Sequence, residues 1–158
     1  KNQKANDQLI GDSGYGQGQI LMNPLQLASI YSAFVNNGSI YRPHLVEQGE
    51  QMWIQRVFSD KTVKTIKEDL INVIADEKGT GHSIYHDNVT LAGKTGTAEI
   101  KQSQSDTTGT ELGWFTVMTT DSKQPLLITT MVEDVKDRGG SGYVVKHTKT
   151  PLDLYLSK

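Results

Sequence analysis

The sequence predicts an α+β domain in which an antiparallel β-sheet is flanked by helices. The first half holds two stretches with apolar residues at helical spacing, and the second half holds three strand-like runs. Short or polar connections join these runs, which favours an antiparallel meander. At 158 residues the chain is long enough for one domain with its own core.

The composition argues against several classes of function. The net charge is −2, which offers no electrostatic basis for binding nucleic acid or an anionic membrane. Without cysteine the chain can form neither disulfides nor thiolate sites, and this is compatible with an extracytoplasmic bacterial location. The sequence shows no signal peptide and no apolar run near the ~20 residues that span a membrane. Because the chain begins at Lys1 rather than Met, we expect it to be a piece of a longer protein.

The first third predicts a polar terminus, a glycine turn and a helix. Residues 1–13 are polar and indicate a loop, and the Gly-Tyr-Gly-Gln-Gly run at 14–18 suits a tight turn but not a dinucleotide-binding fingerprint. Asn23 as N-cap and Pro24 at the first helical position begin a helix that Gly38 can end in a left-handed conformation. This helix is apolar over much of its circumference, so we expect it to be buried.

The middle of the chain predicts an extended segment and a second helix. Residues 39–58 look extended, with Trp53 expected in the core. Ser59 caps a helix that a glycine-containing turn at 77–81 ends. One apolar stripe runs along this helix: Val63, Ile66, Leu70 and Ile74.

The second half predicts the sheet and a closing helix. The strand-like runs cover residues 89–100, 112–119 and 126–132. A polar loop at 101–111 separates the first two runs. Residues 141–156 predict a helix that Pro151 should kink or restart.

The run from Leu91 to Glu99 concentrates groups that bind an anion. Lys94 attracts a carboxylate or an oxyanion, and the Thr95 and Thr97 hydroxyls can add directed hydrogen bonds. Gly96 removes side-chain bulk, so a ligand can approach the backbone closely. Strand alternation sends Lys94 and Thr95 to opposite faces, and both reach one ligand only along the strand's edge. We therefore predict the anion-holding edge of an acyl-transfer site that could also pair with an extended peptide. The alternative is an edge lysine that guards against aggregation.

Other chemical readings fit less well. A phosphate-binding loop needs glycine where Asn88 stands and a helix after Lys94, whereas the neighbours favour a continuing strand. His82 and His86 are spaced as metal ligands would be on a helix, but the surrounding glycines oppose one, so we expect loop histidines with solvent or backbone partners. The acidic residues at 133–137 lack the glycine pattern of a calcium loop. We predict no metal site.

The motif at Lys94–Glu99, Lys-Thr-Gly-Thr-Ala-Glu, resembles the third signature of the penicillin-binding proteins, the serine D,D-transpeptidases that cross-link peptidoglycan. Segments similar to class B members occur in the right order at 14–18, 23–28, 79–81 and 113–115. The resemblance covers nearly the whole chain and is closest to the low-affinity, β-lactam-resistant branch of Gram-positive bacteria. It implies the penicillin-binding protein and serine β-lactamase-like fold.

Two family motifs are missing from this sequence. The nucleophile lies in Ser-x-x-Lys and a second motif reads Ser-x-Asn, and neither pattern occurs here. Both precede the matched region in the family, so we expect residues 1–158 to be the C-terminal portion of a single transpeptidase domain. The resemblance implies that the upstream serine attacks the D-Ala-D-Ala carbonyl of a stem peptide, or a β-lactam, and that an amine resolves the acyl-enzyme. It also implies an extracytoplasmic protein on an N-terminal membrane anchor absent from this chain, a cell-wall glycosyltransferase as partner, and no cofactor.

The resemblance assigns roles only to matched positions. Lys94 would supply positive potential and hydrogen-bond the Ser-x-Asn motif. The Thr95 and Thr97 hydroxyls would hold the terminal carboxylate, and the Thr97 N–H would form half of the oxyanion hole. Gly96 would keep the strand edge open, and the loop at 101–111 would border the cleft unless it is only a solvated connector.

Two alternatives stay open. One is a D,D-carboxypeptidase or serine β-lactamase, in which water resolves the acyl-enzyme. The other is a non-catalytic binding or sensor domain that has kept the fold, which the missing Ser-x-x-Lys would favour if the chain were complete.

Overall fold

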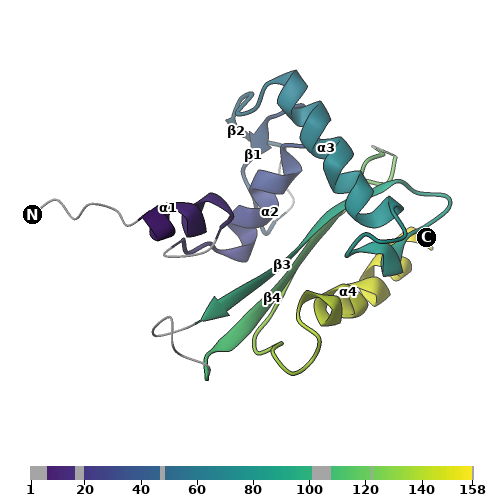
Figure 1. Cartoon of the computed structure of the whole chain (residues 1–158). Coiled ribbons are helices and arrows are strands. Elements are labelled where there is room, and N and C mark those ends of the chain that lie inside the picture. Colours follow the sequence, from purple (N-terminus) through teal and green to yellow (C-terminus); the bar gives the residue numbers. More distant parts are fainter. Residues whose placement is uncertain (1–6, 17–19, 47–48, 101–107, 122, 158) are drawn as a thin grey trace, which may run out of the picture.

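The computed structural model describes residues 7–16, 20–46, 49–100, 108–121 and 123–157. Within these residues an antiparallel sheet runs in the order β3-β4-β5, from β3 (Leu91–Ile100) and β4 (Thr110–Thr119) to β5 (Leu127–Val132). The helix α4 (Ser141–Leu156) lies against one face of the sheet, and α2 (Pro24–Ser32) lies on the opposite side (Figure 1). The predicted α+β class and the meander are confirmed.

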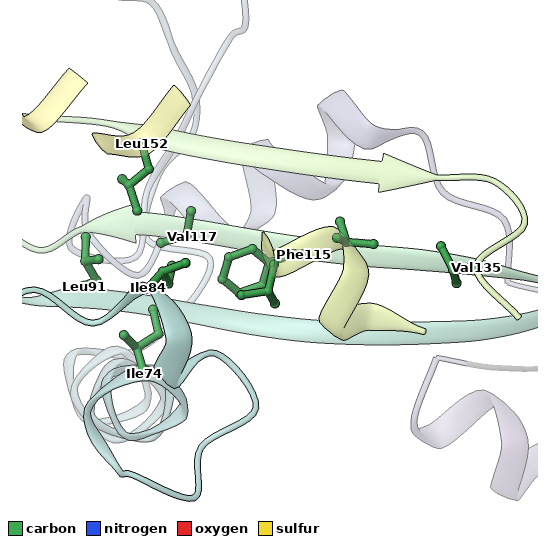
Figure 2. Packing of buried hydrophobic residues seen from close by; sticks show 9 residues of the cluster. Ile74, Ile84, Leu91, Phe115, Val117, Val135 and Leu152 are labelled. Atoms are coloured by element: carbon green, nitrogen blue, oxygen red, sulfur yellow. The ribbon is translucent and has the colours of Figure 1, made fainter. Parts of the chain in front are cut away.

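The larger part of the core fills the space between the sheet and α4. Phe115 and Val117 of β4 are fully buried, and Leu152 of α4 is 1% exposed (Figure 2). Strand alternation sends the odd-numbered residues of β4 to this face. The cluster consists of Ile74, Ile84, Leu91, Phe115, Val117, Val135, Val144, Val145 and Leu152.

A smaller core covers the other face of the sheet. It joins Phe34 and Leu70 to Ala92 of β3 and Met118 of β4. The helix α3 (Asp60–Ala75) serves both clusters, because its Leu70 belongs to this one and Ile74 to the larger one. Helix α3 therefore packs against the first residues of β3, Leu91 and Ala92.

Gly93 allows α3 to approach β3 closely. A Cβ atom at this position would lie 2.8 Å from the Thr116 carbonyl oxygen, 3.0 Å from Ile74 Cδ1 and 3.3 Å from Phe115 Cε2. The first distance is shorter than real Cβ contacts allow, so any side chain here would push the helix or the neighbouring strand away.

The predicted N-caps of α2 and α3 are confirmed. The Asn23 side chain accepts a hydrogen bond from the Leu25 N–H at 2.8 Å, and Gln26 completes a capping box. Ser59 caps α3 by accepting from the Thr62 N–H at 3.1 Å. The predicted helix end at Gly38 is wrong, because α2 ends at Ser32. Gly38, at φ +79°, donates its N–H to the Ala33 carbonyl at 2.8 Å and closes a series of turns after α2.

Some expectations for the first half are wrong. Helix α1 (Asp7–Gly14) occupies much of the segment expected to be a loop, while residues 1–6 lie outside the described part. Helix α2 is not buried, because only Ser29 is and Leu25 is 54% exposed. Its one-sided packing leaves the remaining apolar residues on the surface and beside a cleft described below.

Trp53 is not in the core. It lies in β2 (Met52–Ile54), which pairs with β1 (Ile40–Tyr41) as a separate small sheet, and 48% of it is exposed. The Arg42 guanidinium lies 5.8 Å from its ring centroid and makes a cation–π contact with the exposed ring.

Pro151 does not restart α4, which runs unbroken from Ser141 to Leu156. Its ring lies on the exposed side, while Thr148 and Leu152 are each 1% exposed against the sheet. Packing of these neighbours outweighs the backbone hydrogen bond that proline removes. Across the described residues, no helix has the length and apolar character to cross a bilayer.

Candidate active site

The open edge of β3 carries the predicted anion-binding groups. Among the described residues β3 pairs with β4 and with no strand on its other side. Lys94 is exposed and lies on the face of Ala92, whereas Thr95 is 8% exposed and lies on the face of Leu91. The side chains thus leave the strand on opposite faces, as alternation requires.

The ladder of hydrogen bonds shows which backbone groups face the open edge. The Thr120 N–H donates to the Thr90 carbonyl at 3.0 Å, so Thr90 turns its backbone groups toward β4. In an antiparallel pair this direction alternates along the strand. Thr95 and Thr97 therefore direct their N–H and C=O groups away from β4.

The Lys94 ammonium reaches the same edge. Its Nζ donates to the Thr95 carbonyl oxygen at 2.8 Å, although the side chain leaves from the opposite face. The positive charge, the backbone of Thr95 and Thr97 and the two threonine hydroxyls are therefore brought together along one strand edge. A group of this kind can hold a carboxylate and donate hydrogen bonds to an oxyanion.

Each threonine hydroxyl has a neighbour beyond the strand. Thr95 Oγ1 lies 2.8 Å from Thr80 Oγ1, in the turn after α3. A Cβ atom on Gly140, the residue before α4, would lie 3.5 Å from Thr97 Oγ1. The turn after α3 and the start of α4 thus flank the edge on the face of Thr95 and Thr97.

A cleft of about 400 Å³ opens beside the motif. Residues 15–16 and 20–22 and helix α2 form one side, and β3 and β4 form the other. Trp114 lines this cleft opposite Gly96, its partner in the strand register. The lining residues are Tyr15, Gly16, Ile20, Leu21, Met22, Leu27, Tyr31, Lys94, Thr95, Gly96, Thr97, Ala98, Leu112, Trp114 and Thr116.

Two tyrosines in the cleft keep their phenol protons at neutral pH. Burial raises the pKa of Tyr31 above its ordinary value. The hydrogen bond from the Tyr15 hydroxyl to Asp12, at 2.8 Å, raises the pKa of Tyr15, and the negative charge of Glu99 adds to it. Tyr31 can therefore donate a hydrogen bond to a ligand, whereas the Tyr15 proton is already donated to Asp12, and neither side chain supplies a phenolate.

The histidines lie apart from this edge. His82 begins the short helix η1 (His82–Ile84), and its Nδ1 lies 2.9 Å from the Ile74 carbonyl oxygen. His86 has a carboxylate partner rather than solvent or backbone, with Nε2 3.0 Å from Asp153 Oδ1. Within the described residues no three His, Cys, Asp or Glu side chains gather as a metal site would need.

Thr80 contacts the anion-binding edge, and the sequence does not predict this contact. The Gly-Thr-Gly run at 79–81 predicts the turn that ends a helix and carries a point of resemblance, but nothing local indicates that its hydroxyl meets a strand residue 15 positions further on. The expected loop at 101–111 is described only from residue 108, and β4 begins at Thr110, two residues earlier than predicted.

The chain is similar to known cell-wall proteins along most of its length. The family model of the penicillin binding protein transpeptidase domain matches residues 1–150. Penicillin-binding protein 3 of Bacillus subtilis is 42% identical over 146 residues, which are 90% of this chain and 22% of that protein. Peptidoglycan D,D-transpeptidase MrdA of Haemophilus influenzae is 27% identical over 166 residues, covering 92% of this chain and 25% of that protein.

Solved structures show the same fold. PBPA from Mycobacterium tuberculosis superposes with a TM-score of 0.70 at 22% identity, over 89% of this chain and 33% of the other. The transpeptidase domain of penicillin-binding protein 3 from Burkholderia pseudomallei gives 0.65 at 19% identity, over 84% of this chain and 43% of that one. The chain thus spans 22% and 25% of the two curated relatives. It belongs to the penicillin-binding protein transpeptidase domain family.

Proposed function

We propose that residues 1–158 are the C-terminal portion of a peptidoglycan D,D-transpeptidase domain and supply its Lys-Thr-Gly strand. The observation that carries this proposal is the edge of β3, where the Lys94 ammonium lies 2.8 Å from the Thr95 carbonyl beside outward-facing backbone. The family and the name of the relative MrdA support the same reaction class.

The proposed reaction is an acyl transfer in two steps. A serine upstream of this chain attacks the carbonyl of D-Ala-D-Ala, and the negative charge that develops on oxygen accepts a hydrogen bond from the Thr97 N–H. The peptide bond breaks, the terminal D-Ala leaves with a proton on its nitrogen, and an ester links the peptide to serine. An amine of a second stem peptide then attacks the ester, which restores the serine hydroxyl and forms the cross-link.

Each residue of the strand has a distinct role in this scheme. Lys94 supplies positive potential at the edge and hydrogen-bonds the upstream Ser-x-Asn motif, while the hydroxyls of Thr95 and Thr97 hold the terminal carboxylate of the donor. Gly96 leaves its side of the cleft open, because it has no side chain to occupy the space beside Trp114. The carboxylate of a β-lactam would occupy the same position.

The wider setting follows from the same proposal. The protein would act at the extracytoplasmic face of the bacterial membrane, anchored by a segment outside this chain, with a cell-wall glycosyltransferase as partner. Because the sequence resembles the low-affinity branch, we also propose that β-lactams acylate the protein slowly.

The test uses the full-length protein that contains these residues. We expect its upstream sequence to contain Ser-x-x-Lys and Ser-x-Asn. Given a donor peptide ending in D-Ala-D-Ala and an amine acceptor, it should release D-alanine and form the cross-linked product, which mass spectrometry detects. Release of D-alanine with hydrolysed donor alone would indicate a carboxypeptidase. No reaction with peptide or β-lactam, together with missing motifs, would indicate a sensor domain and contradict the proposal.

A further inference from the structure

A threonine outside the strand contacts the anion-binding edge. Thr80 Oγ1 and Thr95 Oγ1 are 2.8 Å apart, a good distance for a hydrogen bond between hydroxyls. Thr95 is 8% exposed, and its side chain leaves β3 on the face of Leu91, where the only hydroxyl partner that the described residues give it is Thr80. The Thr80 contact therefore decides how that hydroxyl is oriented.

The turn that carries Thr80 is held firmly against the end of α3. The Gly81 N–H donates to the Val73 carbonyl at 3.0 Å, and the Gly79 N–H donates to the Asp76 carbonyl at 2.8 Å. A Cβ atom on Gly79 would lie 2.2 Å from the Val73 carbonyl oxygen, so this close approach requires glycine. Thr80 is thus presented to β3 by a turn that cannot easily shift.

The direction of the hydrogen bond matters because each hydroxyl carries one proton. If Thr95 donated to Thr80, its remaining lone pairs would repel a carboxylate at the edge of β3. If Thr80 donates to Thr95, the Thr95 proton is available for the carboxylate. We propose that Thr80 is a positioning residue that donates to Thr95 and thereby makes Thr95 a hydrogen-bond donor to the ligand's carboxylate. This inference rests on the proposed function.

The experiment measures acylation of the full-length protein by benzylpenicillin and by its methyl ester, which lacks the charged carboxylate. The variants are Thr80→Val, which keeps the shape but loses the hydroxyl, and Thr80→Ser, which restores it. Thr130→Val is the matched control, because it removes an equal 2.8 Å hydroxyl pair, with Thr148, away from the cleft. Melting temperatures of all variants accompany the rates.

We expect Thr80→Val to slow acylation by the free acid roughly three- to tenfold, the loss of one hydrogen bond, and to leave the rate with the ester unchanged. Thr80→Ser should restore the rate, and Thr130→Val should not alter it. In a Thr95→Val background, Thr80→Val should have no further effect. Equal slowing with acid and ester, slowing that adds to that of Thr95→Val, or no slowing would overturn the inference. Wild-type protein that benzylpenicillin does not acylate would instead overturn the proposed function.

Discussion

Lys94 combines an exposed side chain with an ammonium held at the strand edge by the Thr95 carbonyl. Replacing it with alanine removes the charge from the edge but little buried surface. We expect Lys94→Ala to slow β-lactam acylation by about 100-fold, the scale of losing a directed electrostatic contact in the transition state. The melting temperature should stay nearly constant, because surface substitutions usually change stability by less than about 0.5 kcal/mol.

The control for this prediction is Lys61→Ala, which removes an exposed lysine from α3. Its acylation rate should equal that of the wild type. If Lys94→Ala also reacts at the wild-type rate, Lys94 is only an edge residue that opposes aggregation.

Gly93, directly before the motif, has little room for a side chain. Alanine there would place its Cβ 2.8 Å from the Thr116 carbonyl oxygen. We expect Gly93→Ala to lower the free energy of unfolding by about 1–3 kcal/mol, measured by urea denaturation. Gly142→Ala is the matched control, since nothing lies within 4 Å of a Cβ there and alanine favours the helix. Equal stability of the two variants would contradict the close packing of α3 against β3.

Single residues were predictable where their chemistry is local. The cap at Asn23 and the alternation of Lys94 and Thr95 follow from neighbours a few positions away. The Thr80 contact and the exposure of Trp53 depend on residues distant in sequence, so periodicity carries no information about them. The roles of Lys94 and Thr97 in catalysis stay predictions.

At the scale of elements, α4 supports the sheet beneath the motif through one buried stripe. Leu152 is 1% exposed, whereas Leu154 on the same helix is 64% exposed. We expect Leu152→Ala to cost about 2–5 kcal/mol of unfolding free energy, because it leaves a cavity against the sheet. Leu154→Ala should cost less than about 0.5 kcal/mol. Similar losses for both would mean that α4 does not pack as described.

Elements with strong local signals were predicted well. The cap and stripe of α3 and the three strands lie close to where the pattern put them. Helix α1 was missed because its segment is polar, and the effect of Pro151 was overestimated because buried neighbours hold α4 on both sides. The burial of α2 was overestimated because an apolar helix that lines a cleft has the same composition as one in a core.

At the scale of the whole molecule, the sheet brings distant segments to one edge. The turn after α3, the motif in β3 and the start of α4 flank Thr95 and Thr97, while α2 and Trp114 line the cleft on the other face. The fold class and strand order were predictable from periodicity and short connections. The cleft was not, because it depends on how helices pack on the sheet.

In the proposed reaction this chain holds the substrate's anionic groups while a serine outside it reacts. The most direct measurement is to expose the full-length protein to benzylpenicillin, digest it and locate the covalent adduct by mass spectrometry. We expect an adduct on the serine of an upstream Ser-x-x-Lys motif. An adduct on any serine within residues 1–158 would contradict it.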